Sequence, residues 1–188
     1  MPKRSVRRTM LTHRRSLTEA QFRLASILIQ NALLETDEYK RAGVLALYAP
    51  IHNEVDTARV AADALASGKR IAFPVVVEHG LIFREVKELS SLEKGSFGIL
   101  EPCPTCMVFD PEEVDIFVLP GVAFDLQGHR IGYGKGYYDK TLHMLEGRGR
   151  FIGFCHDFQL IDTIVGEPHD VRVDMVITEK RAIRPTEP

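Results

Sequence analysis

The amino-acid sequence predicts an α/β fold, a three-layer α/β/α sandwich with a mostly parallel central sheet. Short, continuously apolar runs, typical of strands buried on both faces, alternate with segments whose apolar side chains recur at helical spacing. Such alternation favours parallel strands joined by right-handed crossovers. The chain has 188 residues, 45% of them apolar, which suffices for one sizeable core and is too few for two ordinary domains. We therefore expect a single domain over residues 1–188.

The first elements alternate as this fold requires. Residues 16–34 carry apolar side chains at helical intervals, and their first four residues, Ser-Leu-Thr-Glu, have the pattern of a capping box. Residues 44–48 form a continuous apolar run that stops at Ala-Pro, which predicts a buried strand. Residues 55–66 return to helical spacing and end before Ser-Gly.

The second half continues the pattern with a long glycine-rich interruption. We expect strands over 71–77 and 81–86, joined by a Glu-His-Gly turn, and a loop-rich stretch over 89–113. A strand over 114–119, a glycine-rich segment over 120–136 and a helix over 137–145 follow, and strands over 151–155 and 173–178 complete the sheet.

Charge and hydropathy exclude several classes of protein. The formal net charge is −2 and the pI is near 6.4, so the chain lacks the overall basic field that dominates nucleic-acid binding. No apolar run approaches the roughly 20 residues of a membrane span, and the polar start lacks the apolar core of a signal peptide. We expect a cytoplasmic monomer or weak homodimer that acts on small molecules and binds neither nucleic acid nor membrane. Six basic residues gather near the amino terminus: Lys3, Arg4, Arg7, Arg8, Arg14 and Arg15.

The three cysteines do not indicate a disulfide framework, because their number is odd. Cys103 and Cys106 have the CxxC spacing of redox and zinc sites, but a zinc site needs about four ligands and Cys155 has no second CxxC beside it. His156 adjoins Cys155, yet neighbours on an extended segment point to opposite faces. We interpret Cys103 and Cys106 as loop cysteines in a proline-rich turn, with a metal or redox site as the less favoured alternative.

The segment RIGYGKGYYD, residues 130–139, is the densest in groups capable of chemistry. It leads from the predicted strand over 114–119 into a predicted helix, and ligands of open α/β sheets bind at the carboxyl ends of strands. Glycines let backbone N–H groups approach an anion, a helix amino terminus adds partial positive charge, and Arg130 and Lys135 can reach a di- or triphosphate. The spacing fits neither a Walker A loop nor the Rossmann fingerprint. A mobile connection that uses glycine only to turn is the alternative.

Longer stretches of the chain resemble one enzyme family. Residues 119–125, Leu-Pro-Gly-Val-Ala-Phe-Asp, followed by residues 128–139, closely resemble the signature of the 5-formyltetrahydrofolate cyclo-ligases, also called 5,10-methenyltetrahydrofolate synthetases. Four further stretches stand in the family's order and extend the resemblance over nearly the whole chain: Lys3-Arg-Ser-Val-Arg7, Asn53-Glu54, Phe97-Gly-Ile-Leu-Glu-Pro102 and His169-Asp-Val-Arg-Val-Asp174. The CxxC segment has no place in the family pattern.

The resemblance implies an ATP-dependent ligase that uses Mg²⁺. It would convert 5-formyltetrahydrofolate to 5,10-methenyltetrahydrofolate, with release of ADP and phosphate, by phosphorylation of the formyl oxygen and attack by N10. The implied catalytic residues are Lys135 and Arg130. The implied ATP-binding residues are Lys3, Arg4, Ser5, Val6, Arg7, Arg130, Ile131, Gly132, Tyr133, Gly134, Lys135, Gly136, Tyr137 and Tyr138. The implied folate-binding residues are Ala49, Glu54, Tyr133, Gly134, Lys135, Gly136 and Tyr137.

Carboxylates complete the implied site. Asp139 and Asp170 match the family's metal positions, and Asp174 is a weaker candidate, because an aspartate that enters a strand often only caps or turns the chain. We interpret Asp125 as structural, although it could also orient Arg130.

Some of these residues have plainer interpretations. Without the resemblance, Glu54 could be a surface glutamate that caps the following helix, and the amino-terminal basic run could be a disordered tail. The implied mechanism has no evident need for His52 or His156 as acid–base groups. Two other functional classes stay open, a different nucleotide-binding α/β enzyme and a folate-binding protein that consumes no ATP.

Overall fold

A sheet of eight strands forms the centre of the molecule. The computed structural model describes residues 2–78, 80–95, 98–167 and 170–185, so His79, Ser96, Phe97 and His169, which belong to stretches discussed above, lie outside it. In spatial order the strands are β13 (Ala182–Ile183), β12 (Met175–Ile177), β10 (Arg150–Phe154), β7 (Ile116–Pro120), β1 (Val44–Ala46), β2 (Arg70–Val77), β3 (Gly80–Glu85) and β6 (Val108–Phe109). The five strands from β12 to β2 pair in parallel, and the outer pairs β12–β13, β2–β3 and β3–β6 are antiparallel. The predicted mostly parallel sheet is confirmed.

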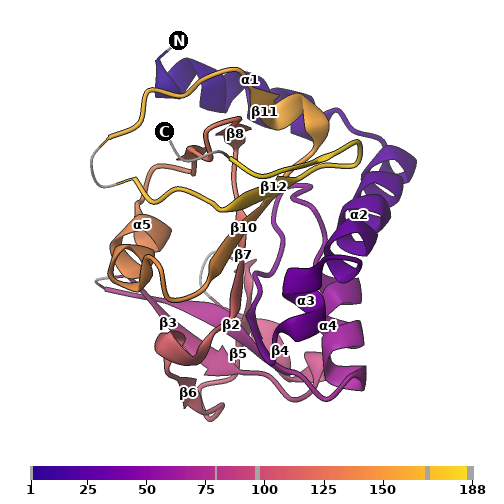
Figure 1. Ribbon diagram of the computed structural model, residues 1–188, viewed down its shortest axis with the longest axis vertical. Coiled ribbons are helices and arrows are strands. Elements are labelled where there is room, and N and C mark those ends of the chain that lie inside the picture. Colours follow the sequence, from indigo (N-terminus) through magenta and orange to yellow (C-terminus); the bar gives the residue numbers. More distant parts are fainter. Residues whose placement is uncertain (1, 79, 96–97, 168–169, 186–188) are drawn as a thin grey trace.

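Helices cover both faces of this sheet (Figure 1). On one side lie α2 (Glu19–Leu34), α3 (Asp37–Arg41) and α4 (Ala58–Ala66), and on the other lies α5 (Tyr137–Leu142), which continues into a 3₁₀ turn, His143–Leu145. Alternate residues of β7 supply the two cores. Ile116 and Val118 pack with the α2–α4 side, whereas Phe117 and Leu119 pack with Leu142 of α5. This period of two is the reason a continuously apolar strand predicts a sheet buried on both faces.

A smaller unit packs against one end of the sheet. It consists of α1 (Lys3–Arg15) and a three-stranded sheet in the order β11 (Leu160–Ile161), β8 (Ala123–Asp125) and β9 (Arg130–Ile131). Val6 of α1 packs with Val122, Ile131 and Ile164 in a separate apolar cluster. The segment over 120–136, expected to be a glycine-rich loop, therefore contains two short strands, and the basic amino terminus forms an ordered helix rather than a disordered tail.

Several predicted boundaries are wrong by a few residues. The Thr18 hydroxyl accepts a hydrogen bond from Gln21 N, and the Gln21 side chain accepts one from Thr18 N, so this pair is the capping box of α2. The box predicted for Ser16 and Glu19 lies two residues too early, and Ser16 instead ends α1. The helix expected from residue 55 begins at Ala58, and the stretch 89–113 contains β4 (Leu92–Lys94), β5 (Leu100–Pro102) and β6. No helix among the described residues is long and apolar enough to cross a membrane.

Phe124 joins the small sheet to the large one. Its side chain is fully buried, and its ring lies between Gly121 and Gly153, where no Cβ is present. A Cβ on Gly153 would lie 2.4 Å from Cε1 of the ring, and one on Gly121 would lie 2.4 Å from Cε2. The ring therefore occupies a slot that only two glycines leave open, and this fixes β8 and the loop that follows it relative to β10.

Gly153→Ala should lower the free energy of unfolding by about 1–3 kcal/mol, because the added methyl group overpacks the slot. Urea unfolding measures the change. Gly43→Ala is the matched control, since its methyl group would make an ordinary 3.7 Å contact with Asp115 Oδ2. If both variants were equally stable, the slot around Phe124 would not constrain the packing.

Candidate functional site

A cavity of about 910 Å³ opens at the carboxyl ends of β1 and β7. Tyr48 and Ala49 follow β1, Pro120 ends β7, and all three line it. Most of the residues that the sequence implied for binding or catalysis line the same cavity: Lys3, Arg7, Ala49, Glu54, Arg130, Ile131, Gly132, Tyr133, Gly134, Lys135, Gly136, Tyr137, Tyr138, Asp139 and Asp170. The structure thus brings together segments from the amino terminus, the first strand, the glycine loop and the carboxyl-terminal region.

The loop between β9 and α5 turns through two glycines with positive φ. Gly134 has φ +101° and Gly136, the amino-terminal cap of α5, has φ +69°, conformations that residues with a Cβ rarely adopt. Arg7 Nε donates to Gly132 O at 2.8 Å, and the Arg7 guanidinium carbon lies 3.6 Å from where a Cβ on Gly134 would be. Helix α1 therefore holds this loop. Because α5 has only six residues, full side-chain charges rather than a helix dipole dominate the positive end of the cavity.

Helix α1 directs only one side of its first two turns toward the cavity. Lys3 and Arg7, one turn apart, line it. Val6 is buried in the apolar cluster under α1, and neither Arg4 nor Ser5 is among the lining residues. Of the five amino-terminal residues implied for nucleotide binding, the helix thus brings two to the cavity.

Arg130 is buried and paired, whereas Lys135 is exposed at the tip of the loop. Arg130 Nη2 donates to Asp139 Oδ1 at 2.8 Å, and the guanidinium lies 5.4 Å from the centre of the Tyr138 ring. Burial raises the pKa of Tyr138, with the negative charge of Glu54 adding to the effect, so this hydroxyl stays protonated well above neutral pH.

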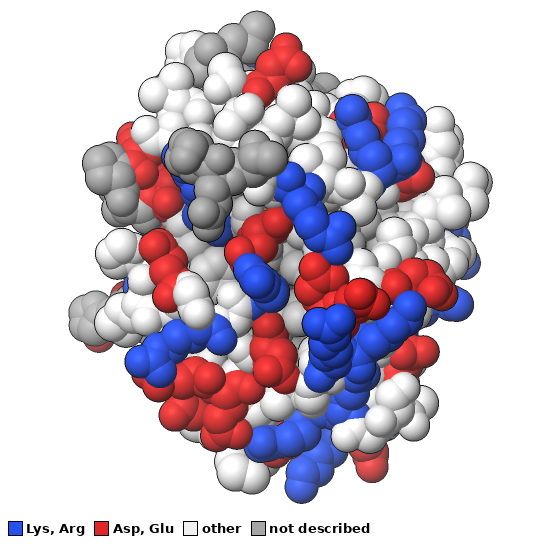
Figure 2. Space-filling view, in the orientation of Figure 1, with Lys and Arg blue, Asp and Glu red and all other residues white. Residues whose placement is uncertain are grey.

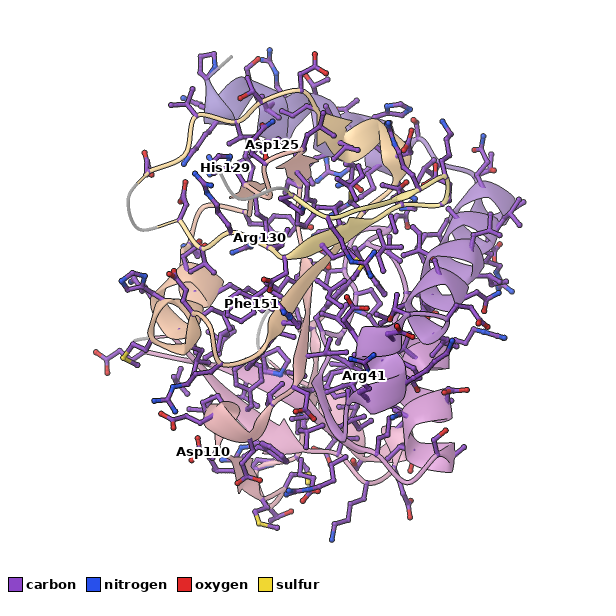
Figure 3. The ribbon with its side chains drawn as sticks, in the orientation of Figure 1. Arg41, Asp110, Asp125, His129, Arg130 and Phe151 are labelled. Carbon is purple, nitrogen blue, oxygen red and sulfur yellow. The ribbon has the colours of Figure 1, made fainter. Side chains whose placement is uncertain are left out.

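Asp125 has the structural role expected for it. Its side chain is fully buried and accepts hydrogen bonds from the backbone N–H groups of Gln127, His129 and Ile164 and contacts the His129 ring at 2.9 Å. Figure 3 labels Asp125 and His129 side by side near α1, with Arg130 below them. The alternative role, orienting Arg130, belongs to Asp139.

Asp139 and Asp170 both line the cavity and offer the oxygen donors that Mg²⁺ prefers. Asp170 Oδ2 accepts from Lys3 Nζ at 2.8 Å, so each carboxylate lies beside a cation that phosphate oxygens would also attract. Within the described ranges no group of three or more His, Cys, Asp or Glu is arranged to hold a metal. This donor set fits an ion that keeps several waters and takes further oxygens from a nucleotide. Asp174 does not belong to it, because its carboxylate accepts from Phe151 N and Arg150 and does not line the cavity.

Glu54 is buried rather than on the surface, so a helix-capping role is wrong for it. Glu54 Oε2 accepts from Ile51 N at 3.0 Å, and Oε1 lies 3.8 Å from Nη2 of Arg14. Burial raises the pKa of Glu54, and the positive charge of Arg14 opposes that rise. Burial together with the negative charge of Glu54 also raises the pKa of Tyr133, to about 12.

Arg14 is a residue whose role at the site the sequence did not predict. Only 1% of it is exposed, although its sequence neighbours on α1, His13 and Arg15, are exposed. It donates through Nε to His52 O at 2.8 Å, through Nη1 to Gly121 O at 3.2 Å and through Nη2 to the Tyr133 hydroxyl. One guanidinium thus joins α1, the turn after β1, the end of β7 and the glycine loop.

The turn that carries Glu54 is also strained. His52 (φ 49°) and Asn53 (φ 58°) are the two residues other than glycine with positive φ in the part of the chain that the structure describes. Arg14 binds the carbonyl of His52, and Nε2 of the buried His156 lies 3.1 Å from the carbonyl of Asn53. Burial lowers the pKa of His156, which favours a neutral ring that positions the turn rather than an acid–base group.

Three buried side-chain atoms in the described residues have no hydrogen-bond partner: Glu54 Oε1, Glu101 Oε1 and Arg130 Nε. All three residues line this same cavity. Because an unpartnered buried polar atom costs about 1–3 kcal/mol, their convergence indicates a site whose partners arrive with a ligand.

The cysteines show no arrangement for a metal within the described part of the chain. Cys103 and Cys106 form a turn in which Cys106 N donates to Cys103 O, and their sulfur atoms lie 2.7 Å apart. Cys155 is buried in the core. On the face shown in Figure 2, basic and acidic side chains are interspersed rather than gathered into one basic field.

Comparisons with known proteins point to one family. The profile of the 5-formyltetrahydrofolate cyclo-ligase family matches residues 1–179. The 5-formyltetrahydrofolate cyclo-ligase of Mycolicibacterium smegmatis is 29% identical over 96% of this chain and 95% of its own, and that of Escherichia coli K12 is 27% identical over 89% of this chain and 95% of its own. The NMR structure of Aquifex aeolicus 5,10-methenyltetrahydrofolate synthetase aligns with a TM-score of 0.87 and 34% identity, covering 100% of this chain and 95% of that one. The synthetase from Mycoplasma pneumoniae aligns with a TM-score of 0.78 and 27% identity, covering 95% and 99%.

Arg14→Met should lower the free energy of unfolding by about 3–5 kcal/mol, because it leaves Glu54 buried without its cation and two carbonyl groups without their donor. Chemical denaturation of the two proteins gives the difference. Arg15→Met, at an exposed position on the same helix, should change stability by no more than about 0.5 kcal/mol. Equal losses in the two variants would show that Arg14 does not hold the site together.

Proposed function

The chain belongs to the 5-formyltetrahydrofolate cyclo-ligase family, ATP-dependent ligases that convert 5-formyltetrahydrofolate to 5,10-methenyltetrahydrofolate, and we propose that it carries out this reaction in the cavity described above. The observation that carries the assignment to the cavity is the convergence of three unpartnered buried polar atoms with Lys3, Arg7 and Lys135 on one space. Its volume of about 910 Å³ is that of a small-molecule pocket.

The chemistry explains why ATP is needed. An amide-like formyl oxygen is a poor leaving group, so attack of N10 on the formyl carbon stalls. Transfer of the γ-phosphoryl group to that oxygen forms a P–O bond and releases ADP. N10 then forms a bond to the carbon and loses its proton, and the C–O bond breaks as phosphate departs. Such transfer asks the protein mainly to position the reactants and to stabilise charge.

The positive side of the cavity suits the nucleotide. Lys3 and Arg7 from α1 and Arg130 and Lys135 from the glycine loop supply charges for the phosphates, and the backbone N–H groups at 132–136 are close enough to the cavity to add donors. Lys135 is exposed, so it can follow the transferring group as it moves. We assign Lys135 and Arg130 to stabilising the phosphoryl group during transfer.

The position of Glu54 indicates the part of the cavity that binds the folate. A carboxylate accepts hydrogen bonds from the N–H edge of a pterin, and Oε1 of Glu54, although it lies near Arg14, accepts no hydrogen bond from the residues that the structure describes. Arg14 favours its ionised form, which is the stronger acceptor. Ala49, Tyr133 and Tyr137 line the same space and offer surface for the rings.

Asp139 and Asp170 would hold Mg²⁺ when it enters with ATP, and the ion would neutralise phosphate charge. In the protein alone these carboxylates pair with Arg130 and Lys3. Nucleotide binding would therefore break these ion pairs, and the cations would then bind phosphate oxygens while the carboxylates bind the metal ion.

The purified chain should produce the ultraviolet absorbance of the methenyl product when given 5-formyltetrahydrofolate and MgATP. Lys135→Ala should lower kcat about 100-fold or more, because one charge that stabilises the transferring phosphoryl group is lost. Thermal melting should stay unchanged, since Lys135 is exposed.

Lys87→Ala, which removes an exposed lysine outside the cavity, is the matched control and should retain parental turnover. A folded parent protein that forms no product would refute the proposed reaction. Folate binding without ATP hydrolysis would favour a binding protein, and hydrolysis without methenyl product would favour a different nucleotide-dependent enzyme.

Asp139→Asn should raise the Mg²⁺ concentration for half-maximal rate by about tenfold or more, because the site loses a charged oxygen ligand. Asp174→Asn is the control, as this aspartate lies outside the cavity. Titration of the rate with Mg²⁺ at saturating ATP provides the test. An unchanged requirement in Asp139→Asn, or an equal increase in the control, would count against Asp139 as a ligand.

A further inference from the structure

Glu101 is a buried carboxylate that no step above uses. It lies on β5, only 9% of it is exposed, and its Oε1 has no hydrogen-bond partner in the part of the chain that the structure describes. It lines the same cavity as Glu54 and Arg130. An oxygen that the fold buries without a donor needs one from elsewhere.

The backbone makes room for this side chain at Gly95. A Cβ on Gly95 would lie 2.3 Å from Glu101 Oε2 and 2.6 Å from Cδ, so any larger residue would displace the carboxylate. Gly95 has no positive φ that would itself require glycine. The close approach, rather than the backbone conformation, is therefore what glycine permits here, and it leaves room for the Glu101 carboxylate in its present position.

The surroundings of Glu101 suit a ring system rather than a phosphate chain. The same cavity has apolar lining residues from β2, β3, β5 and the residue before β5: Pro74, Val76, Leu81, Ile99 and Leu100. Figure 1 places β2, β3 and β5 at the opposite end of the molecule from α1, which supplies Lys3 and Arg7. A carboxylate would repel phosphate, and ATP fills the basic side, so the folate is the substrate left for the β5 side.

We propose that Glu101 is a second folate-binding carboxylate, which accepts a hydrogen bond from an N–H group of 5-formyltetrahydrofolate other than the one bound by Glu54, with Gly95 as its positioning residue. This inference rests on the proposed function. The folate carries N–H donors on its pyrimidine edge, on the reduced ring and at the bridging N10, so two acceptors on different walls can act at once.

Glu101→Leu should weaken the binding of 5-formyltetrahydrofolate, measured by titration calorimetry, about 10- to 100-fold, while ADP binding changes less than about twofold. Glu101→Gln retains an acceptor oxygen and should lose much less. Gly95→Ala leaves the carboxylate in the chain but moves it, and should weaken folate binding as well.

Glu93→Leu is the matched control, because Glu93 is exposed on β4 directly opposite Glu101 in the strand register and does not line the cavity. Urea unfolding of Glu101→Leu should show a protein at least as stable as the parent, since an unpartnered buried carboxylate is removed. Parental folate affinity in Glu101→Leu, or a loss of ADP affinity in its place, would overturn the inference. A parent protein that binds no folate would instead refute the proposed function.

Discussion

The burial of one guanidinium constrains the rest of this site. Arg14 sits in α1 with 1% exposure, and a charge so far from water is stable only with hydrogen-bond partners of good geometry. Those partners lie 38, 107 and 119 residues away in the sequence, at His52, Gly121 and Tyr133. Because α1, the turn after β1, the end of β7 and the glycine loop meet at the same group, none can move far without leaving that charge unpaired. Helix α1 is thus part of the wall of the cavity.

The ion pairs along the cavity serve another purpose. Lys3–Asp170 and Arg130–Asp139 are ready-made pairs at the edge of the space where we expect phosphates and a metal ion. Each ion pair positions its cation and its carboxylate, and both groups can still exchange partners when a ligand binds. When a triphosphate and a divalent ion enter together, the cations gain phosphate oxygens and the carboxylates gain the ion, so the number of paired charges is conserved. Such an exchange lowers the desolvation cost of binding, because the groups are already partly withdrawn from water.

Local sequence patterns predicted those elements whose burial leaves a regular pattern of apolar residues in the sequence. The continuous apolar runs found the strands of the parallel sheet, since burial on both faces demands them. Strands of two or three residues such as β8, β9 and β13 were missed because no periodicity is visible over so few positions. Helix α1 was missed because its basic residues outnumber the apolar ones that pack beneath it. The glycine loop, Glu54 and the two metal candidates were found through motif resemblance. Glu101 stands in the mid-chain stretch of the resemblance, but no role was predicted for it or for Arg14, because whether a charged residue is buried depends on contacts distant in the sequence.

Arg14 and Glu101 are both buried ionisable residues, but Arg14 has a structural role and Glu101 has a role in ligand binding. The hydrogen bonds of Arg14 go to groups within the chain, so its burial contributes to holding segments together. Glu101 Oε1 meets no donor among the described residues, so its burial costs stability until a ligand supplies one. A fold selected only for stability would replace such a carboxylate with an apolar side chain, and a glycine placed to accommodate it would be unnecessary. The free-energy cost of burying this carboxylate has an explanation if the substrate supplies the missing donor. A ligand that lacks that N–H group would leave the carboxylate unpaired. Unpartnered atoms in this cavity therefore discriminate between ligands as well as bind them.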